Sequence, residues 1–397
     1  MNPYLRNGQS ASSDPRTLPA PTAEEQALSD QLQHRIRDEI VAAGGAISFA
    51  RYMELALYAP ALGYYTAGKH KFGADGDFTT APELGSLFAR CLARQCQPIL
   101  AELGGADILE AGAGSGALVA DLLLELETYD VLPERYLILE LSTELRARQA
   151  ETLRARAPQH LERVHWIDRL PGTVRGIVLA NELLDALPME RLKVTETGVH
   201  RLDVVWENDC FAWRENPADA PIRDRIEPLA LPSGYLSEIN LQAEAWVRSV
   251  ADVLQQGVML LVDYGFPRAE FYHPQRMGGT LMCHYRHRAH DDPLMLIGLQ
   301  DITAHVDFTA IAEAGIGAGL ALAGYTSQAA FLMACGLDKL AASSDPDAVR
   351  THLALTQEIK KLTLPHEMGE LYKVIALGRG VQEPLMGFAL HDRRGRL

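Results

Sequence analysis

A strand, a glycine-rich turn and a helix follow one another directly in the first half of the chain, and this succession constrains the fold most. Ile108 and Leu109 indicate the end of a buried strand, Gly112, Gly114 and Gly116 form the turn, and residues 117–127 carry apolar side chains at helical spacing. Glycines without side chains let a ligand approach the backbone N–H groups at the start of the helix. The pattern predicts a parallel α/β sheet that binds a nucleoside-bearing ligand.

An acidic residue closes the next apolar run. Residues 136–139 predict a second strand, and Glu140 follows near the ~20-residue spacing from the glycines that is expected of an acid binding ribose hydroxyls. A dinucleotide fingerprint places its third glycine three residues after the second, whereas these glycines alternate. Glu110, just before them, suits the cationic amino acid portion of S-adenosylmethionine. The cofactor predicted is S-adenosylmethionine, with NAD as the less favoured alternative.

Composition restricts the partners and the compartment. The net charge of −15 argues against a nucleic-acid partner, because such a partner is bound through phosphate contacts. No apolar run approaches the ~20 residues of a membrane span, so no membrane insertion is expected. The five cysteines are odd in number and scattered, which suits a reducing compartment. We therefore expect a cytoplasmic location.

The remaining pattern predicts the domain organisation. Helical and apolar runs alternate from the glycine turn onward, which indicates an α/β, Rossmann-like, mostly parallel sheet with helices on both faces. We expect a disordered tail over residues 1–22, a helical amino-terminal cap over 23–104 and the sheet-containing core over 105–397. Within the core, an insertion at 190–232 indicates antiparallel strands, and one at 264–305 indicates a loop.

A further buried strand ends in polar side chains. Residues 176–180 are apolar, and Asn181, Glu182 and Asp185 follow them. Because ligands of open parallel sheets bind beyond the carboxyl ends of the strands, these side chains are expected to face the same crevice as the glycine turn. The alternative is that Asn181 and Asp185 merely cap the following turn.

Residues 181–188, NELLDALP, resemble the N-E-x-x-D-A-x-P signature of the MidA-like family of class I methyltransferases. Further blocks resemble the family in the same order, from PALGYY at residues 60–65 and GDFTTAPE at 76–83 to VDYG at 262–265 and MGE at 368–370. The resemblance spans about residues 47–377, although no block matches within 190–232. It implies a class I fold that uses S-adenosylmethionine.

The resemblance also implies an acceptor, because the family includes a mitochondrial complex I assembly factor that methylates an arginine. We therefore expect a protein substrate, possibly a respiratory complex I core subunit or its equivalent. A guanidinium is always protonated, so its site needs carboxylates that orient it and accept a proton. The catalytic acids expected are Glu182, Asp185 and Glu238. Which of the first two contacts the acceptor is left open, as is the oligomeric state.

The residues expected to bind the cofactor come mainly from the ends of the predicted strands. Residues 76–80 are expected to fold over the cofactor as a lid, with an ordinary connecting loop as the equal alternative. The full cofactor-binding set is Asp77, Glu110, Gly112, Gly114, Ser115, Gly116, Glu140 and Asn181.

A histidine cluster invites a metal site, but the sequence argues against one. His284, His287 and His290 are interleaved with Arg286 and Arg288, whose positive charges would repel a cation. No metal is predicted. Two other functions stay open: a methyltransferase for a small molecule, which would need a closed apolar pocket, and an assembly chaperone that binds the cofactor without catalysis.

Overall fold

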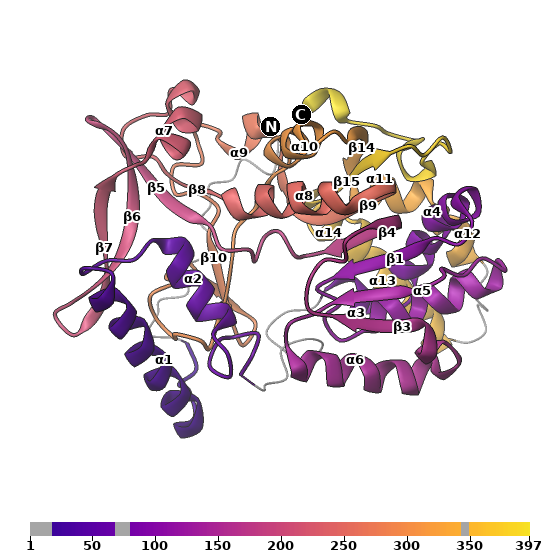
Figure 1. Cartoon of the computed structure of the whole chain (residues 1–397), viewed down its shortest axis with the longest axis horizontal. Coiled ribbons are helices and arrows are strands. Elements are labelled where there is room, and N and C mark those ends of the chain that lie inside the picture. The colour runs from indigo at the N-terminus through magenta and orange to yellow at the C-terminus, as the bar shows by residue number, and fades with distance from the viewer. Residues whose placement is uncertain (1–17, 68–79, 343–348) are drawn as a thin grey trace. The chain divides into compact units, whose positions relative to one another are not determined.

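The structure is a computed structural model that describes residues 18–67, 80–342 and 349–397, which fall into two compact units (Figure 1). The units are described separately. As far as it is described, unit 1 comprises Met1–Phe78, Leu184–Ala243 and Arg268–Val306, and unit 2 comprises Thr79–Leu183, Glu244–Pro267 and Asp307–Leu397. Each unit is therefore assembled from separate segments of the chain.

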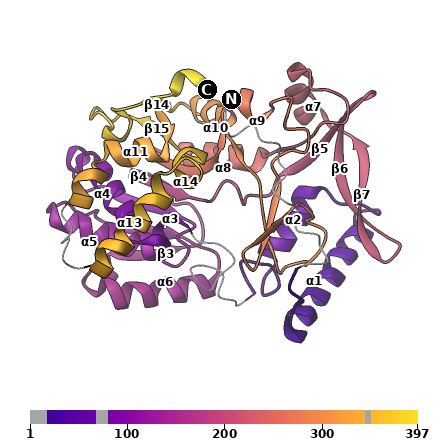
Figure 2. The same cartoon turned by 180° about the vertical axis from the view of Figure 1, so that it is seen from behind.

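Unit 2 contains the central sheet, with its strands in the order β3-β2-β1-β4-β9-β15-β14. Strands β3, β2, β1, β4 and β9 pair in parallel, and β15 pairs antiparallel with both β9 and β14. Figure 1 labels these strands except β2, and Figure 2 shows the sheet from behind. Their bounds are β1 Asp107–Ala111, β2 Tyr136–Leu139, β3 Val164–Ile167, β4 Val174–Asn181, β9 Leu254–Phe266, β14 Ala321–Ser327 and β15 Tyr372–Arg379.

The register brings the carboxyl ends of the parallel strands to one edge of the sheet. Ala111 of β1 pairs with Leu139 of β2 on one side and with Ala180 of β4 on the other. Asn181, the last residue of β4, pairs with Val262 of β9. The turns that follow β1, β2 and β4 therefore emerge side by side, as expected for a sheet of this kind.

Helices cover this sheet because its strands are apolar on both faces. Val258, Leu260 and Val262 of β9 lie in one core with α4 and α5, whereas α10 packs on β9, β14 and β15. The helices of unit 2 are α3 Ala81–Leu84, α4 Leu87–Leu103, α5 Ala117–Thr128, α6 Thr143–Arg156, α10 Phe308–Gly317, α11 Gln328–Ala334, α12 Leu337–Ala342, α13 Val349–Thr363 and α14 Met368–Leu371, with short 3-10 helices at Pro158–Arg163, Met386–Phe388 and Arg394–Arg396. Helix α8, Leu241–Val253, begins in unit 1 and continues into unit 2.

Unit 1 combines two antiparallel sheets with amino-terminal helices. One sheet has the order β7-β6-β5-β8 and the other β11-β10-β12. Helix α2 packs against the first sheet through aromatic rings, including Phe49 against Trp213 and Tyr52 against Phe211. The bounds are α1 Ala23–Ala42, α2 Phe49–Tyr58, β5 Glu190–Thr195, β6 Gly198–Glu207, β7 Cys210–Pro217, α7 Ala220–Ile226, β8 Leu236–Ile239, α9 Arg268–Phe271, β10 Met282–Tyr285, β11 Arg288–His290 and β12 Asp301–Thr303, with a 3-10 helix at Glu227–Leu229. The two-residue strand β13, Val306–Asp307, belongs to neither of these sheets and pairs with β9.

The predicted fold class is confirmed, and two local predictions are wrong. Residues 264–305 were expected to form a loop, but they contain α9 and the three-stranded sheet β11-β10-β12. Each of these strands is too short to show a clear alternation. The sequence pattern of residues 82–103 predicts one long helix, but the helix is interrupted at Gly85. A Cβ there would lie 2.1 Å from the carboxylate of Glu358, which accepts a hydrogen bond from Leu87 N and caps α4.

The antiparallel strands predicted within residues 190–232 are present as β5, β6 and β7. The sequence-based boundaries at residues 22 and 104 stay a prediction. Among the residues that the structure describes, no helix is both long enough and apolar enough to cross a membrane.

Candidate active site

The glycine turn after β1 has the backbone that the sequence predicts. Gly112, Gly114 and Gly116 have φ angles of 70°, 53° and 84°, which side-chain-bearing residues rarely adopt. A Cβ on Gly112 would lie 3.1 Å from Leu183, and one on Gly116 would lie 3.0 Å from the backbone of Gln149. A Cβ on Gly114 would meet nothing within 4 Å. The outer glycines therefore permit close packing, and Gly114 borders open space that a ligand could enter.

Two side chains of helix α6 hold this turn through hydrogen bonds to its backbone oxygens. The Gln149 side-chain amide donates to Gly114 O at 3.1 Å and to the Glu140 carboxylate at 3.2 Å, and it accepts a hydrogen bond from Trp166 at 2.8 Å. The Thr152 hydroxyl donates to Ser115 O at 2.7 Å. The turn and the acid after β2 are thus connected through one glutamine, so their relative position is well defined.

Glu140 follows the last residue of β2 and is buried. Its carboxylate accepts hydrogen bonds from Ser142 N at 2.9 Å and from Gln149. Burial raises the pKa of Glu140, and these hydrogen bonds oppose the rise. An oriented carboxylate one strand away from the glycine turn fits the ribose-binding role predicted from its spacing.

Glu110 lies beneath the turn and is also buried. The Tyr136 hydroxyl donates to its carboxylate at 2.7 Å. Burial raises the pKa of Glu110 to about 7, although the hydrogen bond from Tyr136 lowers it. The carboxyl group of Glu110 is therefore engaged by the neighbouring strand, and its predicted contact with the cofactor stays a prediction.

Glu83 is an acid near the turn to which sequence reasoning assigned no role. It lies in the short helix α3, and its carboxylate accepts a hydrogen bond from the Ser115 hydroxyl. The Ser115 oxygen also accepts from Ala117 N at 3.3 Å, at the start of α5. A negative charge is favourable at this helix end, whose unpaired N–H groups carry partial positive charge. The only sequence signal for Glu83 was its place in the block at residues 76–83.

A second group of side chains gathers beyond the carboxyl end of β4. Glu182 has a φ of 50°, an unusual conformation for a glutamate. Its carboxylate accepts hydrogen bonds from the Asn181 side-chain amide at 3.1 Å and from the Tyr372 hydroxyl at 3.0 Å. The Tyr372 ring packs against Tyr264, with centroids 5.4 Å apart. The Glu182 carboxylate is therefore held by its neighbour Asn181 and by Tyr372, a residue that the sequence did not indicate. That these side chains face the same crevice as the glycine turn stays a prediction.

Asp185 and Glu238 belong to unit 1. The backbone oxygen of the buried Asp185 accepts a hydrogen bond from Ala304 N at 3.1 Å. The Glu238 side chain is 1% exposed, and it accepts hydrogen bonds from Thr280 N at 2.8 Å and from the Thr280 hydroxyl at 3.0 Å. Burial raises the pKa of Glu238, and these hydrogen bonds oppose the rise. The catalytic roles of both acids stay predictions.

Two further expectations from the sequence concern the lid that contains Asp77 and the histidine cluster. Asp77 and most of the expected lid lie outside the described residues. The histidines at 284 and 290 lie on the paired strands β10 and β11. Within the described ranges, no group of three or more His, Cys, Asp or Glu side chains could hold a metal ion.

The strand order, the glycine turn and the buried acid after β2 together define a class I methyltransferase that uses S-adenosylmethionine. The comparison with known families agrees. The chain belongs to the family of S-adenosyl-L-methionine-dependent methyltransferases, whose model matches residues 91–326. The cofactor predicted from the glycine spacing is thereby confirmed.

Solved structures give the same result. A crystal structure of a Burkholderia thailandensis protein bound to S-adenosyl-homocysteine is 46% identical, covers 96% of this chain and 100% of its own, and has a TM-score of 0.94. A native crystal structure from the same species is 45% identical with the same coverage and has a TM-score of 0.91. S-adenosyl-homocysteine is the product that S-adenosylmethionine leaves after methyl transfer.

Curated relatives carry a more specific name. The protein arginine methyltransferase NDUFAF7 of Danio rerio is 28% identical, over 88% of this chain and 87% of its own. Its Drosophila melanogaster homolog is 26% identical, over 94% and 92%. Both are named as mitochondrial proteins, as are those of Mus musculus and Homo sapiens. The expected cytoplasmic location is contradicted by this finding and is wrong, because cysteine content reports a reducing environment but does not distinguish compartments.

Proposed function

We propose that this methyltransferase transfers a methyl group to the guanidinium of an arginine side chain in a protein partner. The observation that carries the proposal is the Glu182 carboxylate at the carboxyl end of β4, hydrogen-bonded by Asn181 and Tyr372. Strand β4 is the immediate neighbour of β1, which leads into the glycine turn. The names of the curated relatives support the same acceptor chemistry.

The glycine turn and Glu140, which form the cofactor half of the site, suit S-adenosylmethionine. Gly114 borders open space, and the buried Glu140 presents an oriented carboxylate after the adjacent strand. Bound S-adenosylmethionine supplies a methyl group on a positively charged sulfur. The glycine turn and Glu140 bind and orient it, and alignment of the reacting atoms supplies much of the acceleration.

Glu182 would act on the acceptor. A guanidinium is planar and permanently charged, so a carboxylate orients it through paired N–H donors and compensates its charge. The acceptor nitrogen forms a bond to the methyl carbon as the bond from carbon to sulfur breaks, and sulfur retains that electron pair. The nitrogen then loses one proton, for which Glu182 is the proposed acceptor before the proton passes to water.

We extend the proposal to the partner, as an arginine on a core subunit of respiratory complex I or its equivalent. This extension rests on the family resemblance of the motifs at residues 60–65, 76–83 and 181–188. It commits the acceptor to a folded or assembling protein rather than to a metabolite.

The test is transfer of radiolabelled methyl groups from S-adenosylmethionine to the proteins of a cell lysate. The wild type should label a protein band whose hydrolysate contains methylarginine. Glu182→Gln should lower the rate about a hundredfold, because it removes the charge and the proton acceptor, while S-adenosyl-homocysteine affinity stays unchanged in calorimetry. Glu151→Gln, on the exposed side of α6, is the matched control.

Other outcomes would overturn the proposal. Label confined to small molecules would identify a metabolite methyltransferase, and methyllysine in the hydrolysate would exclude arginine as the acceptor. Cofactor binding with no labelled product would favour an assembly chaperone. Unchanged labelling by Glu182→Gln would remove that residue from the site.

A further inference from the structure

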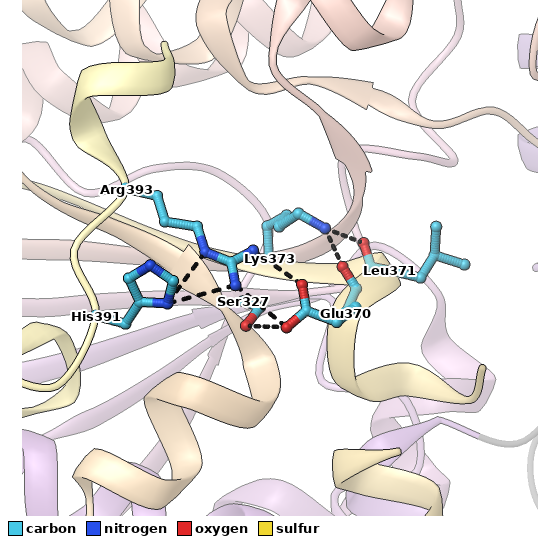
Figure 3. Close-up of polar contacts among 6 residues, drawn as sticks. All are labelled: Ser327, Glu370, Leu371, Lys373, His391 and Arg393. Atoms are coloured by element: carbon cyan, nitrogen blue, oxygen red, sulfur yellow. Dashed lines mark hydrogen bonds and ion pairs between the residues drawn. The ribbon is translucent and has the colours of Figure 1, made fainter. Parts of the chain in front are cut away.

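A segment near residue 393 is connected to the proposed acceptor site through an ion pair. The Arg393 guanidinium contacts the Glu370 carboxylate through two nitrogens, at 2.9 and 3.2 Å, and the Ser327 hydroxyl donates to the same carboxylate at 3.1 Å (Figure 3). Arg393 N also donates to Tyr325 O at 2.6 Å, which fixes the segment along β14. Both charged side chains are partly buried, so the pair is less screened than one at the surface.

The charge of Arg393 affects its partner. Burial raises the pKa of Glu370, but the hydrogen bonds and charge of Arg393 outweigh it, so the net pKa is lowered. Glu370 is therefore charged at neutral pH. A two-nitrogen contact between guanidinium and carboxylate also restricts the orientation of both groups.

Glu370 lies at a structural junction. It belongs to the one-turn helix α14, which ends at Leu371, and β15 begins at Tyr372. Lys373 is buried, and its ammonium donates to the backbone oxygens of Glu370 and Leu371 (Figure 3). The same ammonium lies 5.8 Å from the Phe266 ring centre. The last turn of α14 is therefore held by Lys373 through its backbone and by Arg393 through the Glu370 side chain.

Tyr372 is the first residue after this junction, and it donates the hydrogen bond to Glu182. A backbone shift at the junction would move the Tyr372 hydroxyl and change the Glu182 carboxylate that it orients. Methyl transfer depends strongly on alignment, so a small displacement of an orienting carboxylate has a large effect on rate.

We propose that Arg393 and Glu370 are positioning residues for the methyl transfer, which act through Tyr372 on Glu182. The proposal rests on the proposed function, since it takes Glu182 as the acid that orients the acceptor. Arg393 and Glu370 do not touch the reacting atoms. Their effect should therefore appear in the rate at saturating cofactor and not in cofactor binding.

The test uses the full chain and the labelling assay, with saturating S-adenosylmethionine and the protein band labelled by the wild type as acceptor. Arg393→Ala should lower the saturated rate about tenfold, while the KM for S-adenosylmethionine and the affinity for S-adenosyl-homocysteine change less than about twofold. Arg393→Lys should restore part of the rate because it keeps the charge. Arg394→Ala is the matched control, since Arg394 contacts Asp392 and Leu322 O but not Glu370.

A double variant tests whether Arg393 acts on Glu182 through Tyr372. If Arg393 acts through Tyr372, Arg393→Ala combined with Tyr372→Phe should be no slower than Tyr372→Phe alone. Additive losses, an equal loss in Arg394→Ala, or a lowered melting temperature with an unchanged rate would each overturn the proposal.

Failure of the proposed function gives a different pattern. A slow Glu182→Gln variant beside a fully active Tyr372→Phe variant would overturn only the positioning role. A fully active Glu182→Gln variant would overturn the role of Glu182 itself. Hydrogen exchange gives a readout without catalysis: Arg393→Ala should speed exchange in residues 368–376 but not in the glycine turn, and unchanged exchange at the junction would contradict the coupling.

Discussion

Two parts of the edge of the central sheet are built in different ways: the cofactor half, which comprises the glycine turn and Glu140, and the acceptor half, which is the proposed acceptor site around Glu182. The cofactor half takes most of its residues from one continuous stretch, from the end of β1 to Gln149 on α6. The acceptor half brings Glu182 together with Tyr264 and Tyr372, and through the junction with Arg393. The first half is thus local in sequence, and the second depends on contacts between distant segments.

This difference has an energetic side. In the cofactor half, three glycines adopt positive φ angles that other residues rarely adopt, and burial raises the pKa of the nearby Glu110. In the acceptor half, the Glu182 carboxylate accepts a long-range hydrogen bond from Tyr372, and Glu182 itself has a positive φ. Substitutions in the first half should therefore act on cofactor binding and on pH-dependent stability, and those in the second on rate.

The largest effect is expected at Gly114. Gly114→Val introduces a side chain into the open space over the turn and should weaken S-adenosyl-homocysteine binding at least a hundredfold, about 2.7 kcal/mol, in calorimetry. Gly104→Val is the matched control, because Gly104 also has a positive φ and free space for a Cβ, but lies before β1. Equal weakening in both variants would show that backbone strain, and not the ligand space, determines binding.

A smaller effect is expected at Glu110, on stability. Its pKa of about 7 lies above that of an exposed glutamate, so the folded state binds the proton more tightly than the unfolded state. The stability of the wild type should fall as pH rises from about 5 to about 7 and then level off, for this group alone. Glu110→Gln should therefore be more stable than the wild type above pH 7, on the order of 2 kcal/mol, and equal to it near pH 5.

Denaturant unfolding of both proteins at pH 5, 6, 7 and 8 measures this difference. Glutamine keeps a side-chain oxygen that accepts the hydrogen bond of the Tyr136 hydroxyl, so the contact with the neighbouring strand is retained. A constant difference at all pH values would contradict the raised pKa. A less stable variant at pH 8 would show that the carboxylate is needed in its charged form.

The smallest effect is expected at Glu83. A role for Glu83 in cofactor binding would show that the cofactor half is not entirely local in sequence, because Glu83 contacts Ser115 but precedes β1. If its carboxylate attracts the amino group of the cofactor, Glu83→Gln should weaken S-adenosylmethionine binding about fivefold. Methylthioadenosine, which lacks the amino acid portion, should bind both proteins equally. Equal weakening for both ligands would instead indicate that Glu83 only supports Ser115.

Sequence reasoning succeeded where the determining contacts are short in range. The turn at Gly112–Gly116, the acid at Glu140 and the strand ending at Asn181 follow from glycine placement and apolar runs, which constrain the backbone directly. The interruption at Gly85 could not be predicted, because the side chain that occupies the space of its Cβ belongs to Glu358 on α13. The strands within residues 264–305 escaped notice because each is only three or four residues long.

The candidate site divides along the same line. Asn181 and Glu182 could be predicted because they end a strand of a parallel sheet. Tyr372 could not, since nothing near residue 372 indicates that its hydroxyl meets a glutamate far earlier in the chain. Gln149 was missed for a related reason, because a glutamine on a helix carries no sign of the loop that it contacts.

The position of β15 has a consequence for synthesis on the ribosome. β15 follows β9 and β14 in the chain but lies between them in the sheet. Until residue 379 has emerged, the nascent protein must therefore expose unpaired backbone edges on both strands, the kind of surface that promotes aggregation. Insertion of β15 pairs the facing edges of β9 and β14 in one step and places Tyr372 beside Glu182, so a stalled or prematurely released chain would lack both the complete sheet and the proposed acceptor site.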